Sequence, residues 1–388
     1  MLFTLVVFVI VLAVMVFFHE LGHFGTARKL GVKCDEFGFG FPPRICGWRK
    51  VNGKRKFFWG NKPTEDIKSD DTIYSMNWIP IGGFVKIKGE NGEDSKDDDS
   101  FGSKKIWKRT AILSAGVTMN VVLAMVCLSI AFMIGAPQPI TEDMDPNLVR
   151  DQKIQVVSVI SDTPAEEQGV QLGDVLVSIN DQKFETIEQV QGFTNEHEGE
   201  ELSLKVERLG EEKDFKLTTT ILEQTGKSGM GVGLSLTGIV KHPWYQSIWY
   251  GILATFNMLW MILVAFATVI KNAVMGQPIG VEVAGPVGIA AMTGQVARMG
   301  FNYILQFTAL LSLNLAIINF LPFPALDGGR VLFLIIEKIR GKAVNQKVEQ
   351  IAHTIGFALL MLLILVVTGR DILQFKEFFI NLWDKIIP

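Results

Sequence analysis

The sequence predicts a mostly α-helical membrane protein with a small β-domain inserted between its helices. Of the 388 residues, 48% are hydrophobic, and the mean hydropathy of +0.30 favours several membrane segments over one soluble globule. Between the second and third apolar runs the composition changes to a polar, strand-forming block. The apolar runs that could cross a bilayer are residues 2–18, 111–134, 248–270, 303–321 and 355–368.

Charge is distributed unevenly along the chain. Residues 25–109 carry 18 Lys or Arg against 12 Asp or Glu, whereas residues 136–247 carry 9 against 20. Basic residues favour the cytoplasmic side of a membrane, and the basic cluster at residues 104–109 directly precedes the second apolar run. The first run is therefore predicted to pass from outside to inside, so that its C-terminal end lies near the cytoplasmic face.

The first apolar run ends in a metal-binding motif, His19-Glu20-Leu21-Gly22-His23. Positions i and i+4 share one face of a helix, so His19 and His23 can offer two imidazole nitrogens to one zinc ion. Glu20 is the candidate general base for a zinc-activated water. Ionisable residues at membrane depth are costly, and a metal site is a reason to retain them.

The polar block after the second run has strand and turn patterns. The string from Thr163 to Asn180 resembles a PDZ domain of the bacterial type, and the resemblance covers about residues 152–222. PDZ domains bind extended peptides by strand addition. The alternative is a β-domain that serves only as a spacer. The predicted elements are strands at 155–160 and 175–179, a short helix at 165–168, and a hairpin of 202–207 with 214–219 that turns at Leu209-Gly210.

A third metal ligand is predicted where the fourth apolar run ends. Pro322 and Pro324 break the helix, and a glycine pair follows Asp327, so this carboxylate can turn inward from a broken helix that lines a polar cavity. Asp327 would complete a two-histidine, one-carboxylate zinc site with water in the fourth position. The alternative is an aspartate that only caps the following helix.

These motifs together resemble the site-2 protease family of intramembrane zinc metalloproteases, in its bacterial type with one PDZ domain. The resemblance extends over essentially the whole chain. It implies a four-span site-2 protease-like core with a membrane-associated β-hairpin or sheet and an inserted PDZ β-domain. It also implies one zinc ion per chain held by His19, His23 and Asp327, with Glu20 as the catalytic acid/base.

The same resemblance assigns further parts of the chain. Asn314 and Asn319 match family positions that contact or orient the substrate. Residues 37–41 and 81–89 resemble the glycine-rich sheet and re-entrant loop beside the active site, where an open strand edge could hold an extended substrate. An ordinary cytoplasmic hairpin is the alternative for these two segments. Val117 departs from the family, which usually has proline there, and this puts the entry geometry of the second span in question.

The shared metal site also constrains the number of membrane crossings. His23 and Asp327 each stand at the C-terminal end of an apolar run, so both runs must point the same way across the bilayer. An even number of crossings must then separate these ends. The run at 248–270 is therefore predicted to lie in the outer interface or to pack without traversing, although hydropathy alone favours a full span. A compensating crossing at 281–297 is the less favoured alternative because that segment is rich in glycine.

The chain is predicted to be a multi-pass protein of the bacterial cytoplasmic (inner) membrane. Its PDZ domain is expected to be extracytoplasmic, and its active site is expected to lie near the cytoplasmic side. By resemblance, the substrates are single-span membrane proteins trimmed beforehand by another protease, such as anti-sigma-factor-like proteins or signal peptide remnants. The protein is expected to contact the lipid bilayer and to bind no nucleic acid. A non-catalytic PDZ-containing membrane scaffold is the main alternative, and a transporter is disfavoured because no internal repeat is found. The chain is predicted to have four parts: residues 1–135, the first half of the protease core; 136–225, the PDZ domain; 226–302, a linker and interfacial helix; and 303–388, the second half of the core.

Overall fold

The computed structural model describes residues 2–60, 71–90, 92, 97–140, 149–160, 163–171, 173–208, 210–222, 227–276 and 285–374. The chain divides into two compact units, Met1–Leu128 with Gly251–Pro388, and Ser129–Tyr250. Five helices within the described residues are long and apolar enough to cross a membrane: α1, α2, α5, α7 and α9. The prediction of several membrane-spanning helices is confirmed at this level.

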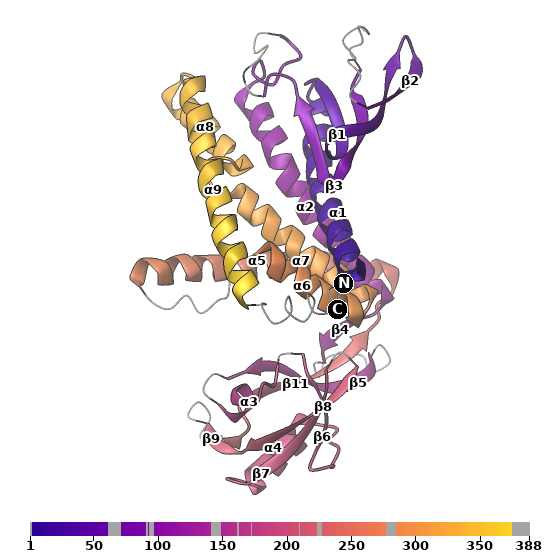
Figure 1. Ribbon diagram of the computed structural model, residues 1–388, viewed down its shortest axis with the longest axis vertical. Helices are drawn as coiled ribbons and strands as arrows, with labels where there is room; N and C mark the ends of the chain where they lie inside the picture. Colours follow the sequence, from indigo (N-terminus) through magenta and orange to yellow (C-terminus); the bar gives the residue numbers. More distant parts are fainter. Residues whose placement is uncertain are drawn as a thin grey trace, which may run out of the picture. The chain divides into compact units, whose positions relative to one another are not determined.

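The helices and strands follow one another as labelled in Figure 1. In chain order they are α1 (Leu2–Lys29), β1 (Cys34–Val51), β2 (Lys54–Trp59), β3 (Ile73–Ile87), α2 (Ile106–Ile134), β4 (Ala136–Pro139), β5 (Val149–Val159), α3 (Pro164–Glu167), β6 (Val175–Ile179), α4 (Ile187–Glu196), β7 (Glu201–Arg208), β8 (Glu211–Thr218), β9 (Thr220–Leu222), β10 (Lys227–Gly229), β11 (Val232–Val240), α5 (Trp244–Met275), α6 (Pro286–Met299), α7 (Phe301–Phe320), α8 (Asp327–Arg340) and α9 (Gln346–Gln374).

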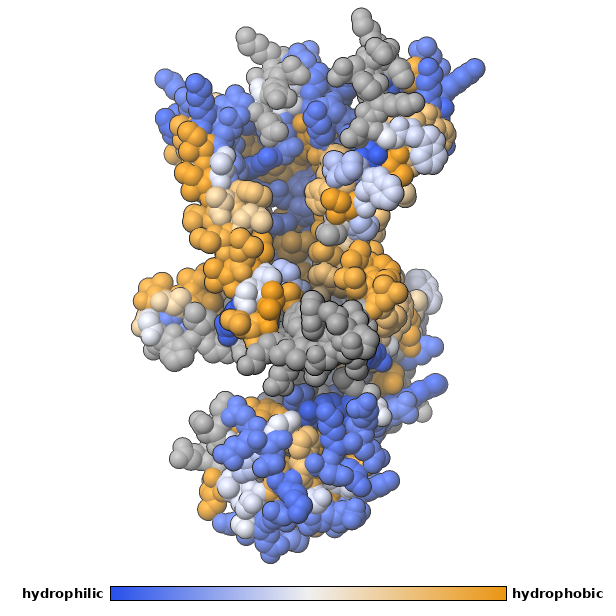
Figure 2. All heavy atoms as spheres, viewed as in Figure 1, coloured by the Kyte–Doolittle hydropathy of each residue, from blue (hydrophilic) through white to orange (hydrophobic). Residues whose placement is uncertain are grey.

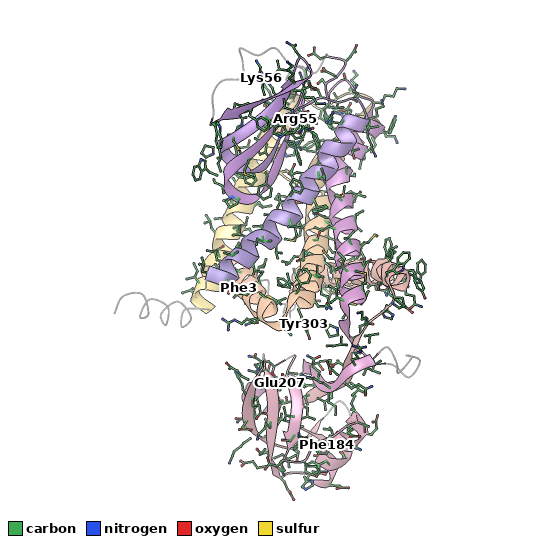
Figure 3. The ribbon with its side chains drawn as sticks, turned by 90° about the vertical axis from the view of Figure 1, so that its right-hand side faces the viewer. Phe3, Arg55, Lys56, Phe184, Glu207 and Tyr303 are labelled. Carbon is green, nitrogen blue, oxygen red and sulfur yellow. The ribbon has the colours of Figure 1, made fainter. Side chains whose placement is uncertain are left out.

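Helices α1 and α7 run in the same direction through the first unit. Figure 3 shows Phe3, at the start of α1, at the same end of this unit as Tyr303, at the start of α7. Arg55 and Lys56, on β2, lie at the opposite end. The C-terminal ends of α1 and α7 therefore lie at the same end of the unit, as a metal site shared by these two segments requires.

Helix α5 lies across the direction of α1 and α7 rather than along them (Figure 1). Its length and composition would allow it to span a membrane. The following helix, α6, has 14 residues, which is shorter than the roughly 20 residues that a transmembrane helix needs. Helix α9 begins before His353 and continues past Asp371, so the short fifth apolar run extends at both ends.

The sheet of the first unit has the strand order β2-β1-β3. Strands β1 and β3 are long, and two stretches of β3 pair with β1: Phe37 of β1 has both Val85 and Tyr74 of β3 as partners. The turn in β3 passes close to α1 at Gly82, where φ is +87° and an added Cβ would meet the side chain of Val16. The sheet packs against α1, where the ring of Phe24 on α1 stacks on that of Phe37 on β1 with ring centroids 4.6 Å apart.

The second unit contains a six-stranded sheet with the order β4-β11-β5-β6-β7-β8. The sheet and α4 enclose a core in which Ile179, Leu202 and Leu217 are fully buried. The strands predicted at 175–179 and in the hairpin are present, and the turn residue Leu209 lies outside the described residues. Strand β11 pairs with β5 beyond residue 225, where the sequence had placed the end of this domain.

Hydrophobic residues cover the helical part of the first unit in Figure 2. Hydrophilic residues gather at the end of the same unit that carries β2 and α8. On α9 the exposed side chains include Leu362 (58%), Leu365 (65%) and Val366 (63%). Large apolar side chains left open to this extent along a whole helix are expected where a helix faces lipid.

Candidate metal centre

The first half of the site is built on one face of α1. His19 and His23 lie one turn apart, and each is only 6% exposed. Their Nε2 atoms are 3.2 Å from one another. The helix thus presents two imidazole nitrogens at a single point, as the i, i+4 spacing predicts.

Helix α2 approaches both imidazoles at Gly116. A Cβ added to Gly116 would collide with Nε2 of His23, and it would lie 2.7 Å from Cε1 and 2.8 Å from Nε2 of His19. On the α1 side, a Cβ at Gly22 would lie 2.9 Å from Cβ of Met119. The two helices therefore cross at a pair of glycines, and α2 continues as an unbroken helix through Val117.

Polar groups behind the imidazoles fix their orientation. Nδ1 of His23 donates to the backbone oxygen of Ile112 at 2.9 Å, which leaves its Nε2 free to act as a ligand. The amide Nδ2 of Asn120, which is fully buried, lies 3.3 Å from Nδ1 of His19. A histidine that ligates a metal through Nε2 carries its ring proton on Nδ1, so the metal-bound form of His19 requires the Asn120 amide to be turned by 180°. Its Oδ1, which has no hydrogen-bond partner among the described residues, then accepts a hydrogen bond from Nδ1 of His19.

Asp327 enters the site from the break after α7. Helix α7 ends at Phe320, and α8 begins at Asp327 itself. An added Cβ at Gly329 would lie 2.8 Å from the carbonyl carbon of Phe323, so the turn requires a residue without a side chain there. Oδ2 of Asp327 lies 3.0 Å from Nε2 of His19 and 3.3 Å from Nε2 of His23.

These three atoms fit a zinc ion. They are the one group of three or more His, Cys, Asp or Glu ligand atoms close enough to share a metal within the described residues. Tetrahedral zinc with bonds of about 2.0–2.2 Å separates its ligand atoms by about 3.3–3.6 Å, close to the distances between these three atoms. Oδ2 of Asp327 is buried and, among the described residues, has no well-directed hydrogen bond. Three protein ligands leave the fourth position for water, as in catalytic zinc sites.

The turn that carries Asp327 is held from α9. Nδ1 of His353 accepts a hydrogen bond of 2.9 Å from the backbone nitrogen of Ala325, whose φ is +83°. An added Cβ at Gly356 would lie 2.8 Å from Cβ of Pro324, so α9 packs directly against this turn. His353 thus supports the turn that carries Asp327.

A cavity of about 470 Å³ opens beside the ligands. Glu20, His23 and Asp327 line it, together with Val85 and Ile87 from the edge strand β3. The predicted general base, two of the three predicted metal ligands and a strand edge therefore share one polar cavity.

Asn314 and Asn319 lie on the last turns of α7. Nδ2 of Asn314 donates to the backbone oxygen of Leu310 at 2.9 Å, and Asn319 is half-buried. Neither is among the described residues that line the cavity. Their assignment to substrate binding stays a prediction.

The groups that orient the ligands were not predicted from the sequence. Asn120 is the clearest omission, because a polar amide within the apolar run 111–134 is a signal that the sequence does contain. The carbonyl of Ile112 and the glycine contact at Gly116 carry no such signal, since both depend on where α1 crosses α2.

Comparison with protein families gives a match over most of the chain. A family model described as peptidase family M50 matches residues 7–59 and 55–363. Similar proteins include zinc metalloprotease RasP of Geobacillus kaustophilus, 28% identical over 96% of this chain and 98% of the relative. Zinc metalloprotease RasP of Oceanobacillus iheyensis is 31% identical over 95% and 98%. Regulator of sigma-W protease RasP of Bacillus subtilis is 30% identical over 95% and 98%.

Among solved structures, the chain is similar to PDZ domains of SdrC-like proteins. The domain from Listeria monocytogenes is 20% identical, covers 22% of this chain and 90% of its own, and has a TM-score of 0.21. The domain from Listeria innocua is 21% identical, covers 21% and 92%, and has a TM-score of 0.20.

Proposed function

The chain belongs to peptidase family M50, the family of the zinc metalloproteases to which it is similar, and from this premise we propose that it hydrolyses a peptide bond within or near the transmembrane segment of single-span membrane proteins. The observation that carries the proposal is the meeting of His19, His23 and Asp327 beside Glu20, on helices apolar enough to cross a membrane. A hydrolytic site at this position acts on substrates that reach it through the bilayer.

Each residue of the centre has a distinct role in this proposal. His19, His23 and Asp327 hold one zinc ion per chain. When bound, zinc supplies Lewis acidity that activates water and polarises a carbonyl group. Glu20 lines the same cavity, accepts the proton of the attacking water, and returns it to the leaving amine.

The substrate is proposed to bind as a strand. A peptide bond in a helix is shielded by its own hydrogen bonds, so the substrate must unwind locally before attack. Among the residues that the structure describes, β3 has a strand partner only on its β1 side, and its residues Val85 and Ile87 line the cavity. Strand addition there would place an extended segment next to Glu20. Asn314 and Asn319 are proposed to orient that segment.

The proposed topology has four crossings, by α1, α2, α7 and α9. The end of the first unit with Arg55 and Lys56 faces the cytoplasm under the positive-inside rule. Helix α5 is proposed to lie in the outer interface, which its orientation across α1 and α7 supports. The second unit is proposed to be an extracytoplasmic PDZ domain of a protein in the bacterial cytoplasmic membrane.

The substrates are proposed to be anti-sigma-factor-like proteins or signal peptide remnants. The name of the Bacillus subtilis relative, regulator of sigma-W protease, supports the first of these. The PDZ domain would act as a size filter that admits substrates only after another protease has trimmed them. If deletion of residues 152–222 left cleavage of untrimmed substrate no faster, the filter would be refuted.

The decisive experiment compares cells that carry the wild type with cells that carry Glu20→Gln. The membrane-protein fragments of the two strains are compared, and the zinc content of both purified proteins is measured. We expect Glu20→Gln to keep its zinc and to lose cleavage, because the ligands are unchanged and the general base is gone. Full cleavage by the variant would refute the role of Glu20.

A further inference from the structure

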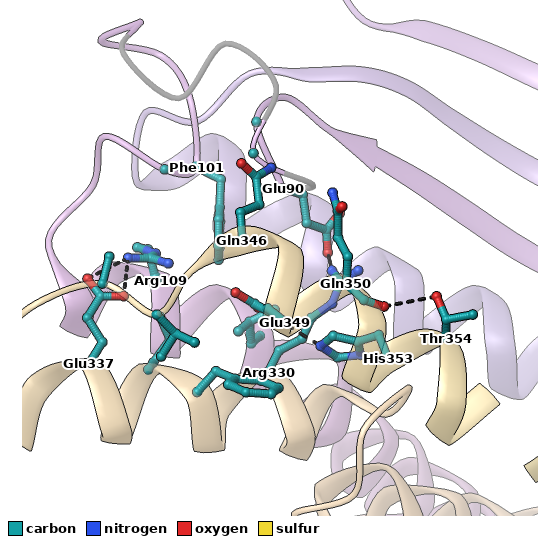
Figure 4. Close-up of a pocket in the computed structure, with 18 residues that line it drawn as sticks. Glu90, Phe101, Arg109, Arg330, Glu337, Gln346, Glu349, Gln350, His353 and Thr354 are labelled. Carbon is teal, nitrogen blue, oxygen red and sulfur yellow. Dashed lines mark hydrogen bonds and ion pairs between the residues drawn. The ribbon is translucent and has the colours of Figure 1, made fainter. Parts of the chain in front are cut away.

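A second polar cavity lies directly behind the metal cavity. It has a volume of about 640 Å³, and Figure 4 shows it between α8, α9 and the segment that follows β3. Glu90, Arg330, His353 and Thr354 line both this outer cavity and the metal cavity. These four residues therefore form the wall between the two spaces.

The wall is closed by an ion pair. Nη1 of Arg330 donates to the Glu90 carboxylate, and the two side chains are 31% and 21% exposed. Figure 4 shows both near His353, away from the second ion pair of the outer cavity, Arg109 with Glu337 at 3.1 Å. A partly buried pair of this kind restricts both side chains more than a pair on the open surface does.

The ion pair joins the two elements that hydrolysis must align. Arg330 lies three residues after Asp327, on the first turn of α8. Glu90 lies three residues after Ile87, the last residue of the edge strand, and its backbone nitrogen donates to the Ile87 oxygen at 3.3 Å. The ion pair thus links the helix that carries Asp327 to the segment that directly follows the substrate edge.

The segment that carries Glu90 is itself anchored. Nζ of Lys88 is 2.7 Å from a carboxylate oxygen of both Asp97 and Asp99. The backbone nitrogen of Lys88 also donates to the oxygen of Lys33 at 2.9 Å, which ties the segment to the loop between α1 and β1. Two sets of contacts at Lys88 therefore hold in place the segment from which Glu90 reaches Arg330.

We infer that Glu90 and Arg330 are positioning residues for hydrolysis, whose ion pair sets the substrate edge of β3 against the helix of Asp327 and closes the metal cavity toward the outer cavity. The inference rests on the proposed function. Reactive geometry is sensitive to shifts of about 1 Å, which can lower a rate on the order of a hundredfold. Loss of the pair is therefore expected to lower kcat about tenfold while KM changes less than about twofold.

The test uses the purified full chain with zinc and a single-span peptide that carries a fluorophore and a quencher on either side of its transmembrane segment. The variants are Glu90→Gln, Arg330→Gln and both together, with Glu337→Gln as the matched control. The control removes the same charge from the other ion pair of the same cavity. We expect it to match the wild type.

Two results distinguish positioning from general damage. If the residues act through one ion pair, the double variant is no slower than the slower of the two single variants, because the pair is already broken in each of them. Zinc content stays at one per chain in every variant, which shows that the centre still assembles. Multiplying defects, or a Glu90→Gln protein with wild-type kcat, would overturn the inference.

A readout without substrate keeps the inference separate from the proposed function. We expect EDTA to remove zinc several-fold faster from Glu90→Gln than from the wild type or Glu337→Gln, because the wall between the cavities is open. Equal rates in all three proteins would overturn the inference even if cleavage is never observed. Conversely, an inactive Glu20→Gln protein beside an unaffected Glu90→Gln protein would refute only the positioning role.

Discussion

The contact between Gly116 and the two imidazoles gives the sharpest prediction, which is the effect of Gly116→Ala. The new methyl carbon would meet Nε2 of His23 first and would lie 2.7 Å from Cε1 of His19, whereas ordinary contacts begin at 3.4 Å. Either α2 or the two imidazoles must therefore move by at least about 0.7 Å, which exceeds the roughly 0.5 Å that a functional site tolerates. We expect zinc affinity to fall about 10- to 100-fold, or about 1.4–2.7 kcal/mol.

Zinc affinity is measured by competition with a chelator on the purified protein. Gly25→Ala is the matched control, because an added Cβ at Gly25, on α1, meets no atom within 4 Å. The control should bind zinc as the wild type does, with a helix equally or more stable, since alanine is the better helix former. If Gly116→Ala bound zinc as tightly as Gly25→Ala, the helix crossing described above would be wrong.

Three further predictions concern other parts of the chain. Asn120→Leu removes the polar partner of His19 and should lower zinc affinity about 10- to 100-fold in the same competition assay; an unchanged affinity would show that the amide does not orient the ligand. Burial raises the pKa of the Cys34 thiol to about 12. At about pH 8, iodoacetamide should therefore label Cys34 far more slowly than the less buried Cys46, and the Cys34 rate should rise with pH as thiolate forms. Equal labelling of both cysteines in the folded protein would contradict this. The Asp174 carboxylate is 1% exposed and lies 2.6 Å from Nε of Arg208. Arg208→Ala leaves this carboxylate buried without its cation, and we expect it to lower the free energy of unfolding of the second unit by about 3–5 kcal/mol, measured by urea-dependent proteolysis. A loss below about 1 kcal/mol would refute the pairing.

Local patterns were enough to predict many elements of the fold. The apolar runs became α1, α2, α5, α7 and α9, because a membrane-length stretch of apolar residues is recognisable without knowledge of its neighbours. Alternating patterns were enough for β6 and for the hairpin of β7 with β8. Strand β11 was missed, because it contains two glycines and is stabilised by its pairing with β5, more than 70 residues earlier in the chain.

The candidate site was predictable to the extent that its signals are local. His19, Glu20 and His23 form a motif on one helix, and the prolines and glycines around Asp327 mark a broken helix within a single short segment. The groups that orient and support these residues were not predictable. Asn120 lies next to His19 because α2 packs against α1, and His353 accepts a hydrogen bond from the backbone nitrogen of Ala325 because α9 packs against the turn before α8.

The sequence by itself determined which residue types could bind zinc and on which kinds of element they stand, because hydrophobic periodicity, helix spacing and helix-breaking residues act over a few positions. Tertiary structure alone decided that Asp327 lies 3.0 Å from His19, that Gly116 faces both imidazoles, and that Glu90 meets Arg330. Those contacts join residues between about 90 and 310 positions apart. Their geometry follows from how helices and strands pack together, which no short window of sequence encodes.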